Sequence, residues 1–219
     1  MAGAALLGLF LALPVAVLVG RAIVDGSLLR IVAAGAVLDA LSLSLLTTAI
    51  SLVITVALGL PLAVVLARGR FRGSSVLEAA VDLPIVLPPA VAGLALLLVL
   101  GRAGLLGGAL TAVGIELPFT TAAVVLAQVF VSAPFFIRSA RTGLAGVDRE
   151  IEDAARVDGA TEGALFRSIT LPLAAPALAG GMIMSWARSL GEFGATIMFA
   201  GNVEGRTQTL PLVVYSQFQ

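Results

Sequence analysis

Five stretches of this chain are apolar enough to cross a lipid bilayer. They cover roughly residues 4–20, 41–67, 82–101, 120–137 and 173–200. A helix needs about 20 apolar residues to cross the hydrocarbon core, where each backbone polar group must be satisfied within the protein. No sustained alternation of apolar and polar residues marks membrane-spanning strands. With 59% hydrophobic and 12% charged residues, the sequence predicts an all-α integral membrane protein.

The first apolar stretch has two interpretations, a retained span or a cleaved signal peptide. A signal peptide has a basic amino-terminal region and an apolar core of about 7 to 15 residues. Met1 to Leu7 contains no basic residue, and the apolar run is longer than that core. We therefore expect a retained span and a single transmembrane domain over residues 1–219.

Prolines fall inside several of the apolar stretches, among them Pro84, Pro88 and Pro89. Proline lacks the backbone N–H, so neighbouring helices must satisfy the carbonyl that it leaves free. The pattern predicts kinked or broken helices, which serve either ordinary packing or gating.

Arginine placement predicts the orientation of the spans. All 13 cationic residues are Arg, and short loops rich in Arg stay on the cytoplasmic side. Eight follow the second and fourth spans, and four lie in the opposite loops. The eight are Arg68, Arg70, Arg72, Arg138, Arg141, Arg149, Arg156 and Arg167, and the four are Arg21, Arg30, Arg102 and Arg206. We expect a cytoplasmic amino terminus and a cytoplasmic loop at about 138–172.

That loop contains a polar segment, Glu152–Pro172, between two apolar stretches. Good helix formers run from Arg149 to Arg156, Gly159 can end that helix, and Thr161 can begin another. The pattern predicts a helix–turn–helix in water that serves as a docking surface. By itself it is equally typical of an amphipathic helix at the membrane surface.

The spacing in this segment resembles the cytoplasmic loop of binding-protein-dependent ABC importer permeases. Their signature is Glu-Ala-Ala, three residues, Gly, nine residues and Ile-x-Leu-Pro, and here Asp153 stands where that Glu is usual, directly after Glu152. Aspartate keeps the negative charge and shortens its reach. The resemblance implies that the loop couples the chain to a separate ATPase through Glu152, Asp153, Ala154, Ala155, Asp158, Gly159, Ala160, Phe166, Ile169, Leu171 and Pro172.

Two longer segments, 82–107 and 187–215, resemble the molybdate and tungstate permeases of this family. Sulfate and thiosulfate permeases share the Gly-Glu-Phe-Gly run at 191–194, whereas the Ala-Thr continuation at 195–196 and the run at 205–211 are closer to the molybdate type. The resemblance implies the MetI-like (type I ABC importer) permease fold with five to six transmembrane helices. Because the family normally has a further span after the outer loop, we expect the last transmembrane helix beyond residue 219.

Family resemblance also implies the partners: a second copy of the permease, two ATPase subunits, an extracytoplasmic oxyanion-binding protein and the lipid bilayer. In that arrangement the delivery protein supplies most of the selectivity. The sequence has no GxxxxGK[ST] loop, so we expect ATP hydrolysis in the partner and no cofactor in this chain. With no His, no Cys and few aromatic residues, metal sites built on those ligands are excluded and nucleic-acid binding is not expected.

Polar residues inside the spans are candidates for the substrate path or a gate. Hydroxyls at 44, 48, 51 and 55 share one helix face, and Arg188 and Glu192 lie four residues apart, close enough to form an ion pair. Each group has an alternative structural interpretation, as interhelical hydrogen bonds or as an ion pair that fixes packing. A fixed carboxylate would repel an oxyanion, so Glu192 is not expected to bind substrate. The candidates are Ser44, Thr48, Ser51, Gln128, Arg188, Glu192 and Thr196.

Two other classes of protein share some of these sequence features. An ion-coupled secondary transporter also has interrupted helices but needs no ATPase, so it does not explain the polar segment. A membrane-embedded enzyme needs catalytic groups, and the spans offer no His, no Cys and no paired carboxylates.

Overall fold

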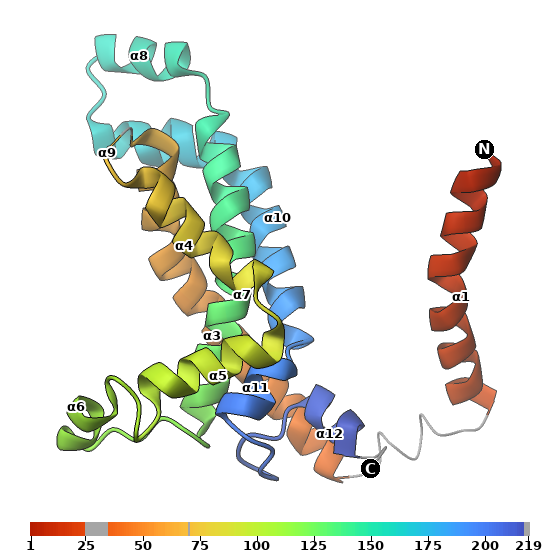
Figure 1. The fold of residues 1–219 in the computed structure, drawn as a ribbon. Helices are drawn as coiled ribbons and strands as arrows, with labels where there is room; N and C mark the ends of the chain where they lie inside the picture. Colours follow the sequence, from red (N-terminus) through yellow and green to blue (C-terminus); the bar gives the residue numbers. More distant parts are fainter. Residues whose placement is uncertain (25–34, 70, 217–219) are drawn as a thin grey trace.

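Three long helices form the centre of the molecule in the computed structural model, which describes residues 1–24, 35–69 and 71–216. They are α3 (Gly35–Arg68), α7 (Thr121–Ala145) and α10 (Leu171–Leu190), and α7 packs extensively against both of the others (Figure 1). Within the described ranges no strand is present. The all-α prediction is confirmed.

The candidate span over 82–101 is broken near its start, as the prolines predicted. This segment holds the end of α4 (Ser74–Val86) and the whole of α5 (Pro89–Leu100), which meet at a bend of 120°. A residue that precedes proline is driven out of the helical region of backbone space. Leu87 precedes Pro88, which precedes Pro89, and both Leu87 and Pro88 are extended, with ψ values of 133° and 135°. Two consecutive prolines therefore break the helix, as the proline pattern indicated.

The last predicted span, 173–200, also ends early. α10 stops at Leu190, a short irregular segment follows, and α11 (Gly194–Phe199) packs separately against α5. The described residues contain four helices long and apolar enough to cross a membrane, or five when the bent α4–α5 pair counts as one span. α1 (Ala2–Val24) is the first of them and stands apart from the others in Figure 1.

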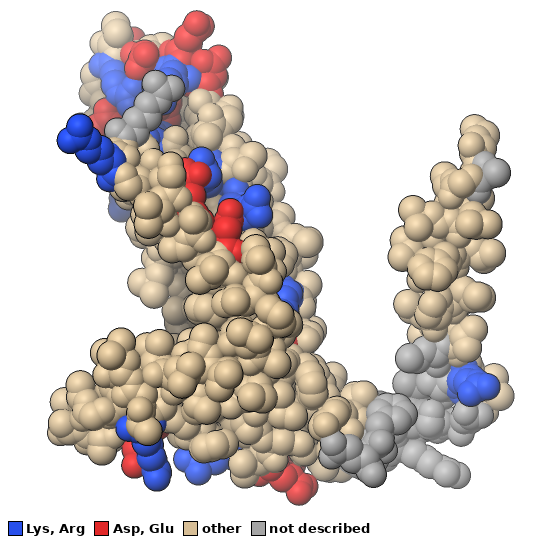
Figure 2. Space-filling model, viewed as in Figure 1, with Lys and Arg blue, Asp and Glu red and all other residues tan. Residues whose placement is uncertain are grey.

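The two sets of loops lie at opposite ends of the long helices. In Figure 2 charged side chains gather at the end that carries α8 (Arg149–Val157), continue part of the way along the bundle, and occur again at the far end below a broad uncharged surface. α6 (Gly107–Ala112) and α12 (Leu210–Ser216) lie toward the far end. Arg30 and Arg70, which entered the arginine count, lie outside the described residues.

Polarity is partly inverted relative to a water-soluble protein. Most of the large apolar side chains point outward, and a set of hydroxyl and amide side chains is buried between α3, α7 and α10. Along α7 two apolar clusters follow one another, one around Val124 and the other around Phe136, and Ser132 lies between them. Outward apolar residues suit contact with lipid, whereas buried polar groups need partners inside the protein.

Small residues allow the central helices to approach closely. A side chain at Gly143 of α7 would collide with Ala177 of α10, and one at Gly93 of α5 would collide with the backbone of Ala195 in α11. Small residues at such crossings give close van der Waals packing, which drives helix association where water is absent. The close approach at Gly93 holds α11 on α5 after α10 has ended.

Candidate coupling loop and polar core

The polar segment folds as the predicted helix–turn–helix. The side chain of Asp148 accepts a hydrogen bond from the Glu150 backbone N–H at 2.9 Å and so caps α8. Gly159 adopts a φ of 89°, a left-handed conformation that costs glycine nothing. Thr161 then accepts a hydrogen bond from the Ala164 N–H at 3.3 Å and caps α9 (Glu162–Leu165). These local signals reverse the chain at one end of the molecule.

The second arm of this helix–turn–helix continues directly into the central bundle. α9 passes into a π-helical turn, η1 (Phe166–Thr170), which is followed without a break by α10. α8 lies across the end of the bundle, joined to it by short segments on both sides (Figure 1). The helix–turn–helix, called the hairpin below (residues 148–172), is therefore joined by continuous helix to α10, which is long and apolar enough to cross a membrane.

The predicted coupling residues divide by exposure. Asp153, Ala154, Asp158, Gly159 and Pro172 are exposed, and Ala155, Ala160, Phe166, Ile169 and Leu171 are half-buried. Ile151 and Val157 add exposed apolar surface to α8. Glu152 is the exception, because only 6% of it is exposed.

Glu152 is held by residues that are distant in sequence. Its Oε1 accepts hydrogen bonds from Nη2 of Arg68 and from Oγ1 of Thr170, the latter at 2.6 Å. Nη2 of Arg68 also donates to Thr170 Oγ1 at 3.2 Å, so the three side chains form a closed ring. Arg68 ends α3 and Thr170 ends η1, so the ring joins α8 to both.

Arg156 joins the two arms of the hairpin through water-exposed ion pairs. Its guanidinium contacts Asp153 in α8 at 2.7 Å and Glu162 in α9 at 2.7 Å. The hydrogen bond from Arg156 lowers the pKa of Glu162, and the bonds to Glu162 and Asp153 raise the pKa of Arg156. Both groups are solvated, so these pairs orient the hairpin more than they stabilise it.

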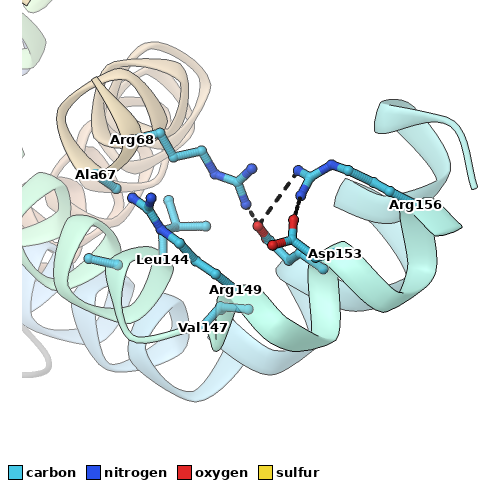
Figure 3. Close-up of a pocket in the computed structure, with 9 residues that line it drawn as sticks. Ala67, Arg68, Leu144, Val147, Arg149, Asp153 and Arg156 are labelled. Atoms are coloured by element: carbon cyan, nitrogen blue, oxygen red, sulfur yellow. Dashed lines mark hydrogen bonds and ion pairs between the residues drawn. The ribbon is translucent and has the colours of Figure 1, made fainter. Parts of the chain in front are cut away.

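A cavity of about 290 Å³ lies between α8 and the ends of α3 and α7. Figure 3 shows Arg68 and Arg156 reaching toward acidic side chains of α8, and Arg149 reaching toward the end of α3. Ala67, Leu144 and Val147 complete the apolar side of this cavity. Its charged side consists of Arg68 and of residues at α8, among them Glu152, Asp153 and Arg156.

The polar core contains the candidate path residues, which are buried except for the half-buried Arg188. The Ser44 hydroxyl accepts a hydrogen bond from the Leu210 backbone N–H at 2.8 Å, and the Trp186 indole N–H donates to Thr48 Oγ1 at 3.2 Å. The amide of Gln128 donates to Thr47 Oγ1 at 3.2 Å. The contacts of Thr48 and Gln128 join helices, as the structural alternative anticipated.

Other buried hydroxyls of this core make no hydrogen bond to any residue that the structure describes. They include Ser51, Thr55, Ser132 and Thr196, and the carbonyl oxygen of Gln128 shares this state. A buried polar atom without a partner is costly. The core is therefore polar enough to interact with water or a polar solute, and the path role of these residues stays a prediction.

Arg188 and Glu192 form the ion pair predicted from their spacing. Nη1 of Arg188 lies 2.6 Å from Oε2 of Glu192, although this oxygen lacks hydrogen-bond geometry. Glu192 lies beyond the end of α10, not within a helix, and its Oε1 accepts the Ala195 backbone N–H at 2.7 Å. The carboxylate thus holds the start of α11 as well as the arginine.

Sequence reasoning missed Arg68 and Thr170 as partners of Glu152. Arg68 was used only to orient the spans, and Thr170 carried no expectation although it directly precedes the Leu-Pro of the loop signature. A polar residue between apolar neighbours at 169 and 171 was the available signal. Trp186 was likewise missed, because its partner Thr48 is 138 residues away.

Comparisons with known proteins agree with the loop signature. The family model described as "Binding-protein-dependent transport system inner membrane component" matches residues 59–216. The molybdenum transport system permease protein ModB of Mycobacterium tuberculosis is 46% identical over 81% of this chain and 67% of its own length. ModB of Escherichia coli is 40% identical over 83% of this chain and 80% of its own length.

An archaeal relative also matches, the molybdate/tungstate transport system permease protein WtpB of Pyrococcus abyssi. It is 38% identical over 87% of this chain and 72% of its own length. The family match covers the end of α3, all of α7 and α10, the helix–turn–helix and the α5–α11 packing. This chain therefore belongs to the family of inner-membrane components of binding-protein-dependent transport systems.

Proposed function

We propose that this chain is the permease subunit of an ATP-driven importer that carries molybdate or tungstate, with the helix–turn–helix 148–172 as its ATPase-docking site. The observation that carries the proposal is the loop signature, with Asp153 in place of the usual Glu, on an exposed hairpin that continues into α10. The names of the relatives, which are molybdenum or molybdate/tungstate permeases, support the substrate class.

The docking surface consists of the exposed side of the hairpin. Asp153, Ala154, Asp158 and Gly159 offer small or acidic surface, and Ile151 adds an apolar anchor. Small residues let a partner backbone come close, and apolar residues supply the buried centre of an interface. The arginines near the hairpin support a cytoplasmic position for it and for the amino terminus.

The transport mechanism follows from the cost of moving an oxyanion through hydrocarbon. An unpaired divalent anion faces a prohibitive loss of hydration in the membrane, so the protein must open a hydrated path and close it again. A ligand shifts such an equilibrium only by binding the two states unequally. ATP-bound and ATP-free partner subunits pull differently on the hairpin, and a homodimer of this chain alternates between inward and outward openings.

Roles of the individual path residues form a further part of the proposal. Ser51, Thr196 and the carbonyl of Gln128 are buried polar groups with free hydrogen-bonding capacity among the described residues. In the open state they hydrate the path. Arg188 and Glu192 form a fixed structural pair at the end of α10, and Ser44 and Thr48 fasten α3 to its neighbours.

Reconstitution tests the proposal directly. The permease, its ATPase and its binding protein are purified together and inserted into liposomes, and uptake of molybdate is measured with and without ATP. We expect ATP-dependent uptake that tungstate inhibits strongly and sulfate weakly. Preference for sulfate would favour the sulfate permease alternative. Uptake by the permease alone under an ion gradient would replace the importer with a secondary transporter.

A further inference from the structure

We propose that Glu152 is a positioning residue, whose ring with Arg68 and Thr170 locks α8 to α3 and α10 so that movement of the hairpin reaches the spans. This inference rests on the proposed function, because it assigns a role within the coupling loop. It gives Glu152 a role different from that of its neighbours in α8, which face the ATPase in the proposed function.

The first support is geometric. One carboxylate oxygen of Glu152 receives both donors, and the arginine that donates to it also donates to the threonine hydroxyl. The three residues belong to α8, to the end of α3 and to the turn that opens α10. Each side chain is therefore held by two others, and displacing one displaces the elements that carry the other two.

The second support is the weakness of the other connections of α8. Short non-helical segments, 146–148 and 158–161, join it to α7 and α9, and such segments can absorb a displacement by changing their backbone angles. The ion pairs of Arg156 join α8 to α9, which continues into α10, but they are exposed to water and therefore weak. Without the Glu152 ring, a pull on α8 would be lost in these turns.

The third support is burial. Glu152 is 6% exposed, whereas the side chain of adjacent Asp153 is 71% exposed. A docking ATPase can reach Asp153 directly, but it could contact the Glu152 carboxylate only by breaking the ring. Both acidic residues contact Arg156, Glu152 at 3.9 Å and Asp153 at 2.7 Å, but only Glu152 also reaches the interior ring.

The test is the number of ATP molecules hydrolysed per oxyanion imported, measured in liposomes with the complete complex. Glu152→Gln keeps the shape of the side chain and removes its charge. We expect the ATPase to remain bound while this ratio rises at least about fivefold, the low end of typical energetic coupling between sites. Glu116→Gln, which breaks the exposed Arg102–Glu116 pair at the far end of the molecule, is the matched control and leaves the ratio unchanged.

Threonine 170 supplies an independent readout. Thr170→Ser keeps the hydroxyl and should retain the wild-type ratio, whereas Thr170→Val has a similar volume without the hydroxyl and should raise it. A loss of packing alone would instead affect Thr170→Ser, which lacks the methyl group, more than Thr170→Val. If Glu152→Gln does not accumulate, the double variant Arg68→Met/Glu152→Met removes the buried charges together, a change that buried pairs often tolerate. We expect that variant to fold, bind the ATPase and show the raised ratio.

Three results would overturn the proposal. They are an unchanged ratio in Glu152→Gln or in the double variant, loss of ATPase binding by Glu152→Gln, and equal behaviour of Thr170→Ser and Thr170→Val. Loss of ATPase binding would place Glu152 in the docking surface. If the wild-type complex shows no ATP-driven uptake, the proposed function has failed, and this is seen before any variant is compared.

Discussion

Two buried glutamates at opposite ends of the molecule each face an arginine, yet they do different work. Glu192 lies four residues from Arg188 and receives the Ala195 N–H, so all its contacts fall within one short stretch. Oε1 of Glu152 accepts hydrogen bonds from Arg68, which lies 84 residues away, and from Thr170, so these contacts join three elements. The local pair shapes one turn, and the long-range ring connects the hairpin to the bundle.

This difference teaches how burial of a charge relates to its role. A buried ion pair contributes little net stability, because both charges have lost water, but breaking it is costly. At Glu192 the cost protects the conformation of a loop. At Glu152 the cost of breaking the pair resists the separation of α8 from the end of α3. The following variants break or sharpen this comparison.

The largest effect is expected for Glu192→Ala. It removes the acceptor of the Ala195 N–H and leaves Arg188 without its partner, so we expect a loss of about 3 kcal/mol in the free energy of unfolding. The single tryptophan, Trp186, allows thermal unfolding in detergent to be followed by fluorescence. Glu116→Ala, in an exposed pair, should cost less than about 1 kcal/mol. Equal losses in the two variants would contradict the assignment.

Charge reversal distinguishes the two sites more sharply. In Arg68→Glu/Glu152→Arg the ion pair can re-form, and the Thr170 hydroxyl can accept where it formerly donated. In Arg188→Glu/Glu192→Arg the Ala195 N–H loses its acceptor, at a cost of about 2 kcal/mol for a charged hydrogen bond. We expect the first double variant to recover stability relative to Glu152→Arg. The second should recover none relative to Glu192→Arg, and recovery at both sites would remove the distinction.

A smaller effect is expected at the turn of the hairpin. Gly159 has a φ of 89° and nothing lies within 4 Å of an added Cβ, so Gly159→Ala strains the backbone without a collision. The left-handed conformation costs about 1 kcal/mol for alanine and less for asparagine. Hydrogen exchange of the α8 and α9 amides should rise in Gly159→Ala and change less in Gly159→Asn. Uptake should fall more in Gly159→Ala than in Gly159→Asn. Equal hydrogen exchange and equal uptake in the two variants would show that the turn conformation is unimportant.

The smallest effect is a pH dependence of the exposed pair in the hairpin. The pKa of Glu162 is lowered by its hydrogen bond from Arg156, so its contribution is present above the unfolded value of about 4.3 and is lost as pH falls through the folded pKa. Hydrogen exchange at the start of α9 should increase over that acidic range. In Glu162→Gln this pH dependence should disappear. An unchanged profile would show that the pair does not hold the two arms together.

Local patterns predicted the hairpin and the Arg188–Glu192 pair because both depend on residues a few positions apart. Gly159 adopts the left-handed conformation of a turn, and Thr161 caps the helix that follows it. Arg188 and Glu192 lie four residues apart, a spacing that brings their side chains together near a helix end. The ring around Glu152 could not be predicted in this way, since its register depends on how α3 docks beside α10. The prolines indicated a break near residue 88, but its angle of 120° follows from the packing of α5 against α11.

The π-helical turn between α9 and α10 places a phase constraint on the loop. A π-turn accommodates one residue more than an α-turn, and each residue rotates an α-helix by about 100°. The hairpin is therefore rotated about the helix axis relative to the orientation that an uninterrupted α-helix would give it. Deleting Ser168 would convert the turn to a regular one and swing the docking face of the hairpin to another side of the molecule. The nine residues between Gly159 and Ile169 therefore determine the direction in which the docking face points as well as its distance from α10.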